Sequence, residues 1–185
     1  MEKQKTIQKE VTLEGVGLHT GNKAKVHFKP AEVNSGISFI RTDLPGHPVL
    51  RADIAHLPHE RAMHRCTSIG NGQAVIHTAE HLMSVLCGLG IDNLRVEIDA
   101  NELPGMDGSG IDFVNAFKKA GLKEQAEPRQ YFEIKEPIWV ERNDSSIFVI
   151  PASDFQVYYV LDYNHPDLPP QFFHVKCDQF RIFRQ

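Results

Sequence analysis

The chain has 185 residues, of which 41% are hydrophobic and 24% are charged, and its formal net charge is −4 at pH 7. These values are typical of a soluble globular protein with one domain or two small ones. The mild negative charge and the scattered basic residues give no reason to expect a nucleic-acid partner. No run of about 18 apolar residues is present, so the sequence predicts no membrane span.

The N-terminus and the cysteines indicate the cellular compartment. The first five residues lead directly into a strand pattern and lack the apolar core of a signal peptide. Cys66, Cys87 and Cys177 are an odd number of cysteines without the spacing of a metal knuckle. We therefore expect free thiols in a reducing cytoplasm.

Alternating apolar and polar residues predict strands at 6–13, 23–28, 37–41 and 49–57. Three glycines in residues 15–21 predict a turn in which the backbone closely approaches another group. His19 lies in that turn. It either faces a ligand or is a loop histidine bonded to backbone.

The next segment contains three histidines, His56, His59 and His64. They have no periodic scaffold that would bring them together, so we do not expect a metal site there. Residues 66–69 and 74–76 are predicted to pair as a hairpin around two closely spaced glycines. That hairpin leads into a helix.

Residues 78–87 predict a short helix that ends at two glycines. Four apolar residues at helical spacing form one stripe, and Glu80 and His81 point away from it. A carboxylate beside an imidazole suits a metal site, with the imidazole as ligand and the carboxylate as base. A solvated polar face with incidental histidines explains the same pattern. The stripe consists of Ala79, Leu82, Met83 and Leu86.

A strand at 94–98 follows, and then a helix that is expected to begin with the capping box Ser109-Gly-Ile-Asp112 and to end at Gly121. Residues 1–125 therefore predict an α+β domain, a two-layer sandwich with a sheet packed on helices. A polar linker is predicted at 124–129. Residues 126–185 predict the β-meander of an incomplete second similar domain, followed by an off-pattern tail. The meander strands are expected at 132–134, 138–141, 147–150 and 157–161.

Four ordered blocks of residues resemble one enzyme family, the UDP-3-O-acyl-N-acetylglucosamine deacetylases, which are zinc hydrolases of lipid A biosynthesis. The first block joins Lys5-Thr-Ile-Gln-Lys-Glu-Val11 to Gly15-Val-Gly-Leu-His-Thr-Gly21, and the second is Arg65-Cys-Thr-Ser-Ile69. The third runs from Thr78-Ala-Glu-His-Leu-Met83 to Gly88-Leu-Gly-Ile-Asp-Asn93, and the fourth is Pro104-Gly-Met-Asp-Gly-Ser109.

The resemblance implies two similar α+β domains with zinc, or alternatively Fe²⁺, and substrate between them. It assigns Glu80 as the catalytic general base and His81 as a zinc ligand. Cys66, Thr67 and His19 become candidate substrate-binding residues. The implied substrate is a UDP-linked acylated N-acetylglucosamine. We also expect a monomer, in the cytoplasm that the cysteines indicate.

The chain also departs from the family pattern. In the family, two further zinc ligands, a histidine and an aspartate, lie beyond the point where this sequence stops. Residues 178–185 do not match the family's Ala-Arg-Thr-Phe block. Because a catalytic zinc site needs about three protein ligands, we expect weak zinc binding and little or no turnover by this C-terminally truncated chain alone.

Two other readings remain open. The chain could be a catalytically dead fragment that folds, or that binds the acyl sugar nucleotide without cleaving it. The string His77-Thr-Ala-Glu-His81 also matches the H-x-x-E-H signature of zinc peptidases, in which both histidines bind metal. That reading requires His77 and His81 on one face of one helix.

Overall fold

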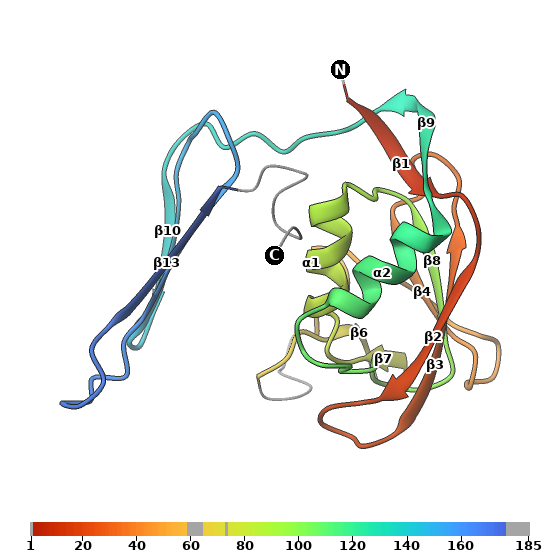
Figure 1. The fold of residues 1–185 in the computed structure, drawn as a ribbon, viewed down its shortest axis with the longest axis horizontal. Coiled ribbons are helices and arrows are strands. Elements are labelled where there is room, and N and C mark those ends of the chain that lie inside the picture. The colour runs from red at the N-terminus through yellow and green to blue at the C-terminus, as the bar shows by residue number, and fades with distance from the viewer. Residues whose placement is uncertain (1, 59–64, 73, 177–185) are drawn as a thin grey trace. The chain divides into compact units, whose positions relative to one another are not determined.

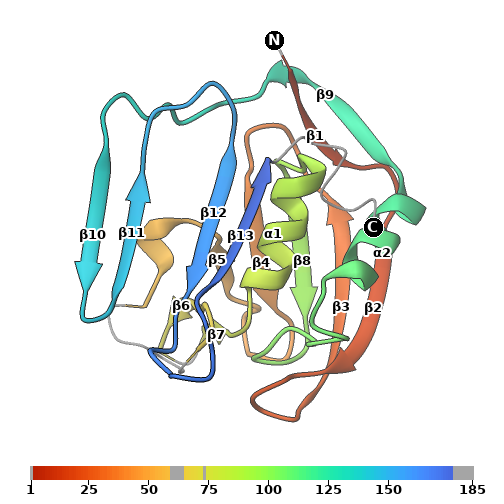
Figure 2. The ribbon, with the colours of Figure 1, turned by 60° about the vertical axis from the view of Figure 1, so that its left-hand side comes forward.

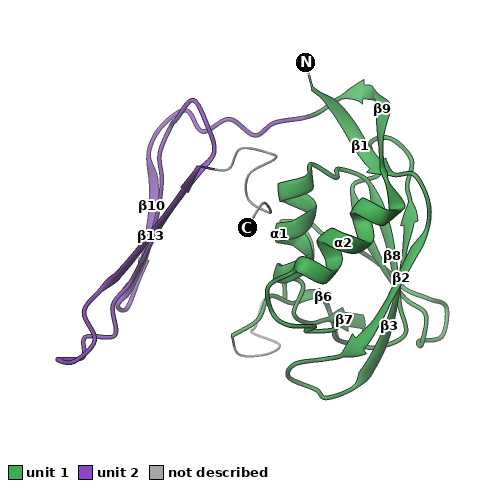
Figure 3. Ribbon diagram, viewed as in Figure 1, with its two compact units in different colours: residues 1–129 green, residues 130–185 purple. Residues whose placement is uncertain are grey.

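The structure is a computed structural model that describes residues 2–58, 65–72 and 74–176. The chain forms two compact units, residues 1–129 and residues 130–185, which Figure 3 colours green and purple. None of the helices in the described residues has the length and apolar content needed to cross a membrane.

A mixed five-stranded sheet forms one layer of the first unit. Its strands are ordered β2-β3-β8-β4-β5, and neighbours are antiparallel except for the parallel pair β4 and β8. The alternating pattern buries Val26, Phe28 and Val96 on one face, while Lys25 is exposed on the other. The strands are β2 (Val11–Val16), β3 (Lys23–Pro30), β4 (Ile37–Arg41), β5 (Val49–Arg51) and β8 (Leu94–Ile98).

Two helices, α1 (Glu80–Leu89) and α2 (Ile111–Ala120), form the second layer and cover one face of the sheet (Figures 1 and 2). The rings of Phe113 and Phe117 on α2 meet Phe28 of β3 edge-on, with centroids 6.1 Å and 5.0 Å apart. Such aromatic pairs contribute about 1 kcal/mol each beyond their buried area. The predicted two-layer α+β sandwich is confirmed.

The two ends of the first unit pair with each other as β1 (Lys3–Ile7) and β9 (Leu122–Pro128). The predictions of one strand over 6–13 and of a linker over 124–129 were therefore wrong. β1 ends at Ile7, which pairs with Leu122, and the Gln8 N–H still donates to the Gly121 carbonyl at 2.8 Å. This pairing spans more than a hundred residues, so no local pattern could indicate it.

The connection from the sheet to α1 also differs in detail from the prediction. The strand expected over 49–57 stops at Arg51, because the Asp53 side chain accepts the N–H groups of Ala55 and His56 and caps a 3₁₀ turn, Ile54–His56. A hairpin precedes α1 as predicted, and its second strand, β7 (Ala74–Ile76), is where it was expected. Its first strand is β6 (Ile69–Asn71) and not 66–69, because Gly70 and Asn71, which were expected in the turn, pair with Val75 and Ala74.

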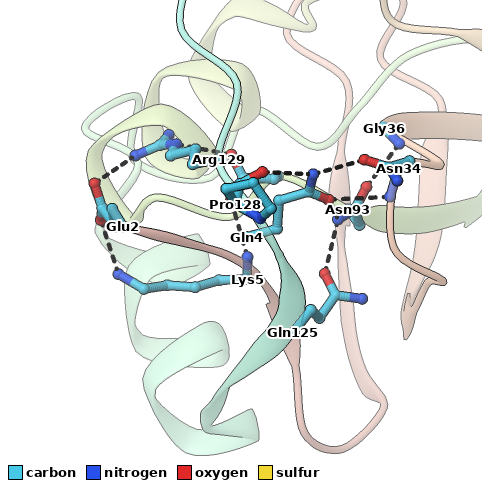
Figure 4. A network of polar contacts seen from close by, with 10 residues as sticks. Glu2, Gln4, Lys5, Asn34, Gly36, Asn93, Gln125, Pro128 and Arg129 are labelled. Carbon is cyan, nitrogen blue, oxygen red and sulfur yellow. Dashed lines mark hydrogen bonds and ion pairs between the residues drawn. The ribbon is translucent and has the colours of Figure 1, made fainter.

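A polar network ties β1 and β9 to the loops beside the sheet (Figure 4). At its centre, Asn93 is 1% exposed, and its Nδ2 donates to Oε1 of Gln4 at 2.8 Å and to Oε1 of Gln125 at 2.7 Å. Its Oδ1 accepts the Gly36 N–H at 2.8 Å. Gln4 in turn donates to Asn34 Oδ1 at 2.7 Å.

Charged groups extend the network toward the N-terminus. Asp92 accepts the Lys5 N–H at 2.9 Å and the Arg129 Nε at 2.8 Å. Glu2 lies 3.3 Å from the Lys5 ammonium and 3.8 Å from the Arg129 guanidinium. The first and last strands of the unit are thus held to the segment that follows α1.

The described part of the second unit consists of two antiparallel hairpins. β10 (Ile138–Arg142) pairs with β11 (Ser145–Val149), and β12 (Gln156–Leu161) pairs with β13 (Gln171–Lys176). Residues 132–134 are not a strand, and β13 was not predicted because it follows a proline-rich loop. The apolar side chains of these hairpins are largely exposed; Trp139 and Phe148 are each 62% exposed and Phe172 is 66% exposed.

Candidate functional site

The first turn of α1 presents Glu80 and His81 at the surface of the first unit. Leu82, Val85 and Leu86 of the same helix are buried, whereas Glu80 and His81 are half-buried. The apolar stripe therefore fixes the rotation of the helix and turns this pair outward, as helical periodicity predicts.

The segment before β6 holds the Glu80 carboxylate in place. The Thr67 N–H donates to Glu80 Oε2 at 2.9 Å, and the Thr67 carbonyl accepts the Ala79 N–H at 3.1 Å. Both backbone groups of Thr67 thus bond to the start of the helix. The structure brings two predicted site residues, Thr67 and Glu80, into direct contact, and it places the half-buried thiol of Cys66 next to Thr67 in the chain.

The helix begins at Glu80 and not at residue 78, because Thr78 has a φ of +59°. A left-handed backbone is a rare state for a β-branched residue and costs about 1–3 kcal/mol. Thr78 therefore marks a sharp elbow between β7 and α1.

His77 lies before this elbow and outside the helix. Its backbone bonds to Asn101 and Leu103, its ring lies 2.9 Å from Ser68 Oγ, and it is 5% exposed. Burial lowers the pKa of the His77 ring, although the nearby Glu102 carboxylate acts in the opposite direction. The peptidase reading is wrong on this geometry, because His77 and His81 do not share a helical face.

A buried carboxylate that sequence reasoning missed connects these segments. Glu102 is 0% exposed. It accepts the His19 N–H at 2.9 Å, the Thr20 N–H and hydroxyl at 2.7 Å each, and the Thr78 hydroxyl at 2.7 Å. The sequence placed Glu102 in a turn-rich connector, where an acid is ordinarily exposed, so no periodic signal distinguished it.

The turn that carries His19 is therefore fixed by its backbone. The His19 residue is exposed, while its N–H and that of Thr20 point at Glu102. Through Glu102 and Thr78, this turn is linked to the start of α1. The described hydrogen bonds include none between the His19 ring and Glu80 or His81, so the assignment of His19 as a substrate-binding residue stays a prediction.

The hydrogen bonds to Glu102 set the pH range of its contribution to stability. Burial by itself raises the pKa of this carboxyl, but the bonds from His19, Thr20 and Thr78 outweigh burial and lower the pKa from 4.5 to about 2. A pKa lowered by folding stabilises the fold above the unfolded value of 4.5, and this contribution is lost as the pH falls toward about 2.

We expect the difference in unfolding free energy between the wild type and Glu102→Gln to shrink as the pH is lowered through this window. Urea unfolding at several pH values between 6 and roughly 2.5 measures it. A difference that stays constant over the range would contradict the assigned pKa.

The residues fit a zinc ion only in part. His81 offers an imidazole, a normal zinc ligand, next to a carboxylate that could serve as a base. Among residues 2–58, 65–72 and 74–176, no three His, Cys, Asp or Glu side chains come together as a metal-binding group. A full set of about three ligands is thus not assembled by the described residues. His59 and His64 lie outside them, so the expectation of no metal site there stays a prediction.

Comparison with known proteins points to one family. The model of the LpxC family, described as UDP-3-O-acyl N-acetylglycosamine deacetylase, matches residues 4–184. The chain is 44% identical over 176 residues to a UDP-3-O-acyl-N-acetylglucosamine deacetylase from Shewanella baltica strain OS155, with 95% of this chain and 56% of the relative covered.

Two further relatives with the same name agree. They come from Shewanella sp. strains W3-18-1 and ANA-3, and each is 43% identical over 95% of this chain and 56% of its own length. The chain therefore spans little more than half the length of the curated relatives it matches.

Proposed function

Because the chain belongs to the UDP-3-O-acyl N-acetylglycosamine deacetylase family, we propose that it is the part of a zinc-dependent deacetylase that carries the general base and one metal ligand. The substrate is a UDP-3-O-(3-hydroxyacyl)-N-acetylglucosamine, and the reaction removes its N-acetyl group for lipid A biosynthesis. The protein acts as a monomer in the cytoplasm, where the free thiols of Cys66 and Cys87 would stay reduced.

Glu80 is the proposed base. The Thr67 N–H engages Oε2 of its carboxylate at 2.9 Å, and in the proposal Oε1 takes the proton. In the proposed reaction Glu80 takes a proton from the attacking water as the water oxygen forms a bond to the acetamide carbonyl carbon. The C–N bond then breaks, and the proton passes from Glu80 to the leaving amine. The products are acetate and the free amine of the sugar.

His81 is the proposed zinc ligand. Bound zinc would lower the pKa of a water molecule and polarise the acetamide carbonyl. Since the described residues supply one suitable imidazole beside Glu80, the remaining ligands must come from elsewhere. We propose that the 185-residue chain alone has little or no turnover and binds zinc weakly, with Fe²⁺ as an alternative metal.

Cys66, Thr67 and His19 are the proposed substrate-binding residues. Thr67 contacts Glu80 through its backbone, and Cys66 precedes it with a half-buried thiol. The glycine-rich turn exposes His19, while Glu102 fixes the backbone beneath it. These positions are consistent with a wall that receives the acylated sugar.

The bond between the Thr67 N–H and the Glu80 carboxylate is the observation that carries this proposal, and a zinc titration tests it. We expect His81→Ala to weaken Zn²⁺ binding to the full chain by about tenfold or more, as loss of a ligand should. Glu80→Gln should leave it within about threefold. His77→Ala should also retain binding. Equal Zn²⁺ affinities for the wild type and His81→Ala would contradict the assignment.

Acetate release from the acylated UDP-sugar, with zinc added, tests the activity. We expect none from the chain alone. Turnover that Glu80→Gln abolishes would overturn the proposed inactivity while supporting the proposed base. Turnover that survives both Glu80→Gln and His81→Ala would contradict the proposed site.

A further inference from the structure

We propose that Glu102 is a positioning residue, which holds the elbow at Thr78 and the turn at His19 and so sets the direction of the first turn of α1. This inference rests on the proposed function, because the direction of the first turn matters for catalysis only if Glu80 is the base and His81 is the zinc ligand. The hydrogen bonds themselves do not depend on the reaction.

The first half of the positioning concerns Thr78. This residue is 2% exposed and has a φ of +59°, a conformation that disfavours a branched side chain. Its hydroxyl donates to Glu102 Oε1 at 2.7 Å. Because the next residue but one is Glu80, the elbow fixes where the helix starts and which way its first side chains project.

The second half concerns the turn between β2 and β3. The consecutive N–H groups of His19 and Thr20 both donate to Glu102, at 2.9 Å and 2.7 Å, and the Thr20 hydroxyl adds a bond of 2.7 Å. Consecutive N–H groups that converge on one carboxylate form a typical anion-binding concavity. One side chain thus joins two segments that are nearly sixty residues apart in sequence.

Close packing leaves the Glu102 carboxylate little freedom. A Cβ atom added at Gly17 would lie 2.7 Å from Thr20 Oγ1 and 2.8 Å from Glu102 Cδ. Both distances are shorter than real contacts of this kind, so the turn needs glycine at this position. Gly17 also bridges to Pro104, two residues beyond Glu102.

The site requires a carboxylate and not an amide. Its donors include two backbone N–H groups, which cannot reverse their direction, whereas the hydroxyls of Thr20 and Thr78 can. A glutamine would place its NH₂ against at least one of these N–H groups in either orientation. Glu102→Gln therefore keeps the size of the side chain and removes the acceptor that the turn or the elbow needs.

The decisive readout is the exchange rate of the Thr67 amide in the full chain, because Thr67 donates to Glu80, whereas the described hydrogen bonds to Glu102 come from His19, Thr20 and Thr78. We expect Glu102→Gln to accelerate this exchange about tenfold and to weaken Zn²⁺ binding by a similar factor, as outer positioning groups do. The control Glu97→Gln removes the same charge from a side chain paired with Lys29 and Arg95, and it should change neither quantity by more than about twofold.

A double-mutant cycle separates positioning from general destabilisation. Glycine adopts the left-handed conformation without the penalty of a Cβ. In a Thr78→Gly background, we therefore expect Glu102→Gln to accelerate Thr67 exchange by less than about threefold. The proposal would be overturned if Glu102→Gln left the exchange rate of the Thr67 amide unchanged. It would also be overturned if Glu102→Gln accelerated this exchange equally in the wild type and in the Thr78→Gly background.

If Glu102→Gln does not fold, the variant Thr20→Val is used in its place. This change removes the hydroxyl of Thr20 as a donor to Glu102 and keeps the Glu102 carboxylate. A smaller acceleration at Thr67 is expected, and none would overturn the proposal. The zinc result for His81→Ala is independent: equal affinity there refutes the proposed function, while a change at the Thr67 amide in Glu102→Gln still supports the positioning.

Discussion

A polypeptide of residues 1–129 is expected to unfold in one cooperative transition, at the same temperature as the full chain. Among the residues that the structure describes, the buried apolar side chains run from Ile7 to Ala120, and the strands of the second unit bury almost none of theirs. Since burial of apolar surface is the main driving force of folding, residues 130–185 should add little to cooperativity.

Calorimetry measures this directly. At about 0.7 kcal/mol per residue, a transition limited to the first unit has an enthalpy of about 90 kcal/mol, against about 130 kcal/mol for the whole chain. We expect both polypeptides to give the smaller value. A full-chain enthalpy near the larger value, or a second cooperative transition, would contradict this prediction.

The single tryptophan provides a matched optical probe. Trp139 lies on β10 and is 62% exposed. We expect its fluorescence to resemble that of a solvated indole before unfolding and to stay nearly unchanged through the transition, while circular dichroism reports the loss of the first unit. A blue-shifted emission that moves at the transition would show that Trp139 is packed in the native chain.

The exposed hairpins also predict poor solubility of the full chain. Apolar strands with open edges tend to pair with other chains, and Trp139, Phe148 and Phe172 are all more than half exposed. The relatives of this family are longer by nearly half of their own length. We therefore expect the polypeptide of residues 1–129 to stay in solution at concentrations at which the full chain aggregates.

Local periodicity was sufficient to predict the layers of the first unit. Val26 and Phe28 alternate with polar residues, and Leu82 and Leu86 recur at helical spacing, so the buried side of each element follows from the sequence. The four motif blocks also led to the correct family, as the match over residues 4–184 confirms.

The remaining features depend on contacts between distant parts of the chain. The pairing of Lys5 with Glu124 joins β1 to β9, and the segment that was predicted to be a linker is therefore a strand. Thr78, which has a positive φ, donates its hydroxyl to Glu102, which follows it by 24 residues. The residues next to each of these positions contain no pattern that would predict the strand pairing or the burial of the acid. The roles of Glu80 and His81 came from the family resemblance, and they stay predictions.

Replacing Asn93 with alanine is expected to lower the unfolding free energy of the first unit by about 3 kcal/mol, the usual scale for loss of several buried hydrogen bonds. The amide of Asn93 bonds to Gln4, Gln125 and Gly36 at 2.7–2.8 Å, and the residue is 1% exposed. Alanine would leave the Gln4 and Gln125 oxygens without this donor. Because β1 and β9 are joined to the sheet at this point, we expect local opening of these strands as well.

Urea unfolding and hydrogen exchange measure the two effects. The matched control is Asn22→Ala, which removes one exposed hydrogen bond to Asn101 at 3.2 Å and should change the stability by less than about 0.5 kcal/mol. If Gln4 and Asn93 act as one unit, the double variant Gln4→Ala, Asn93→Ala should lose less stability than the sum of the single changes. Additive losses, or a loss below about 1 kcal/mol for Asn93→Ala, would show that β1 and β9 are held mainly by their own pairing.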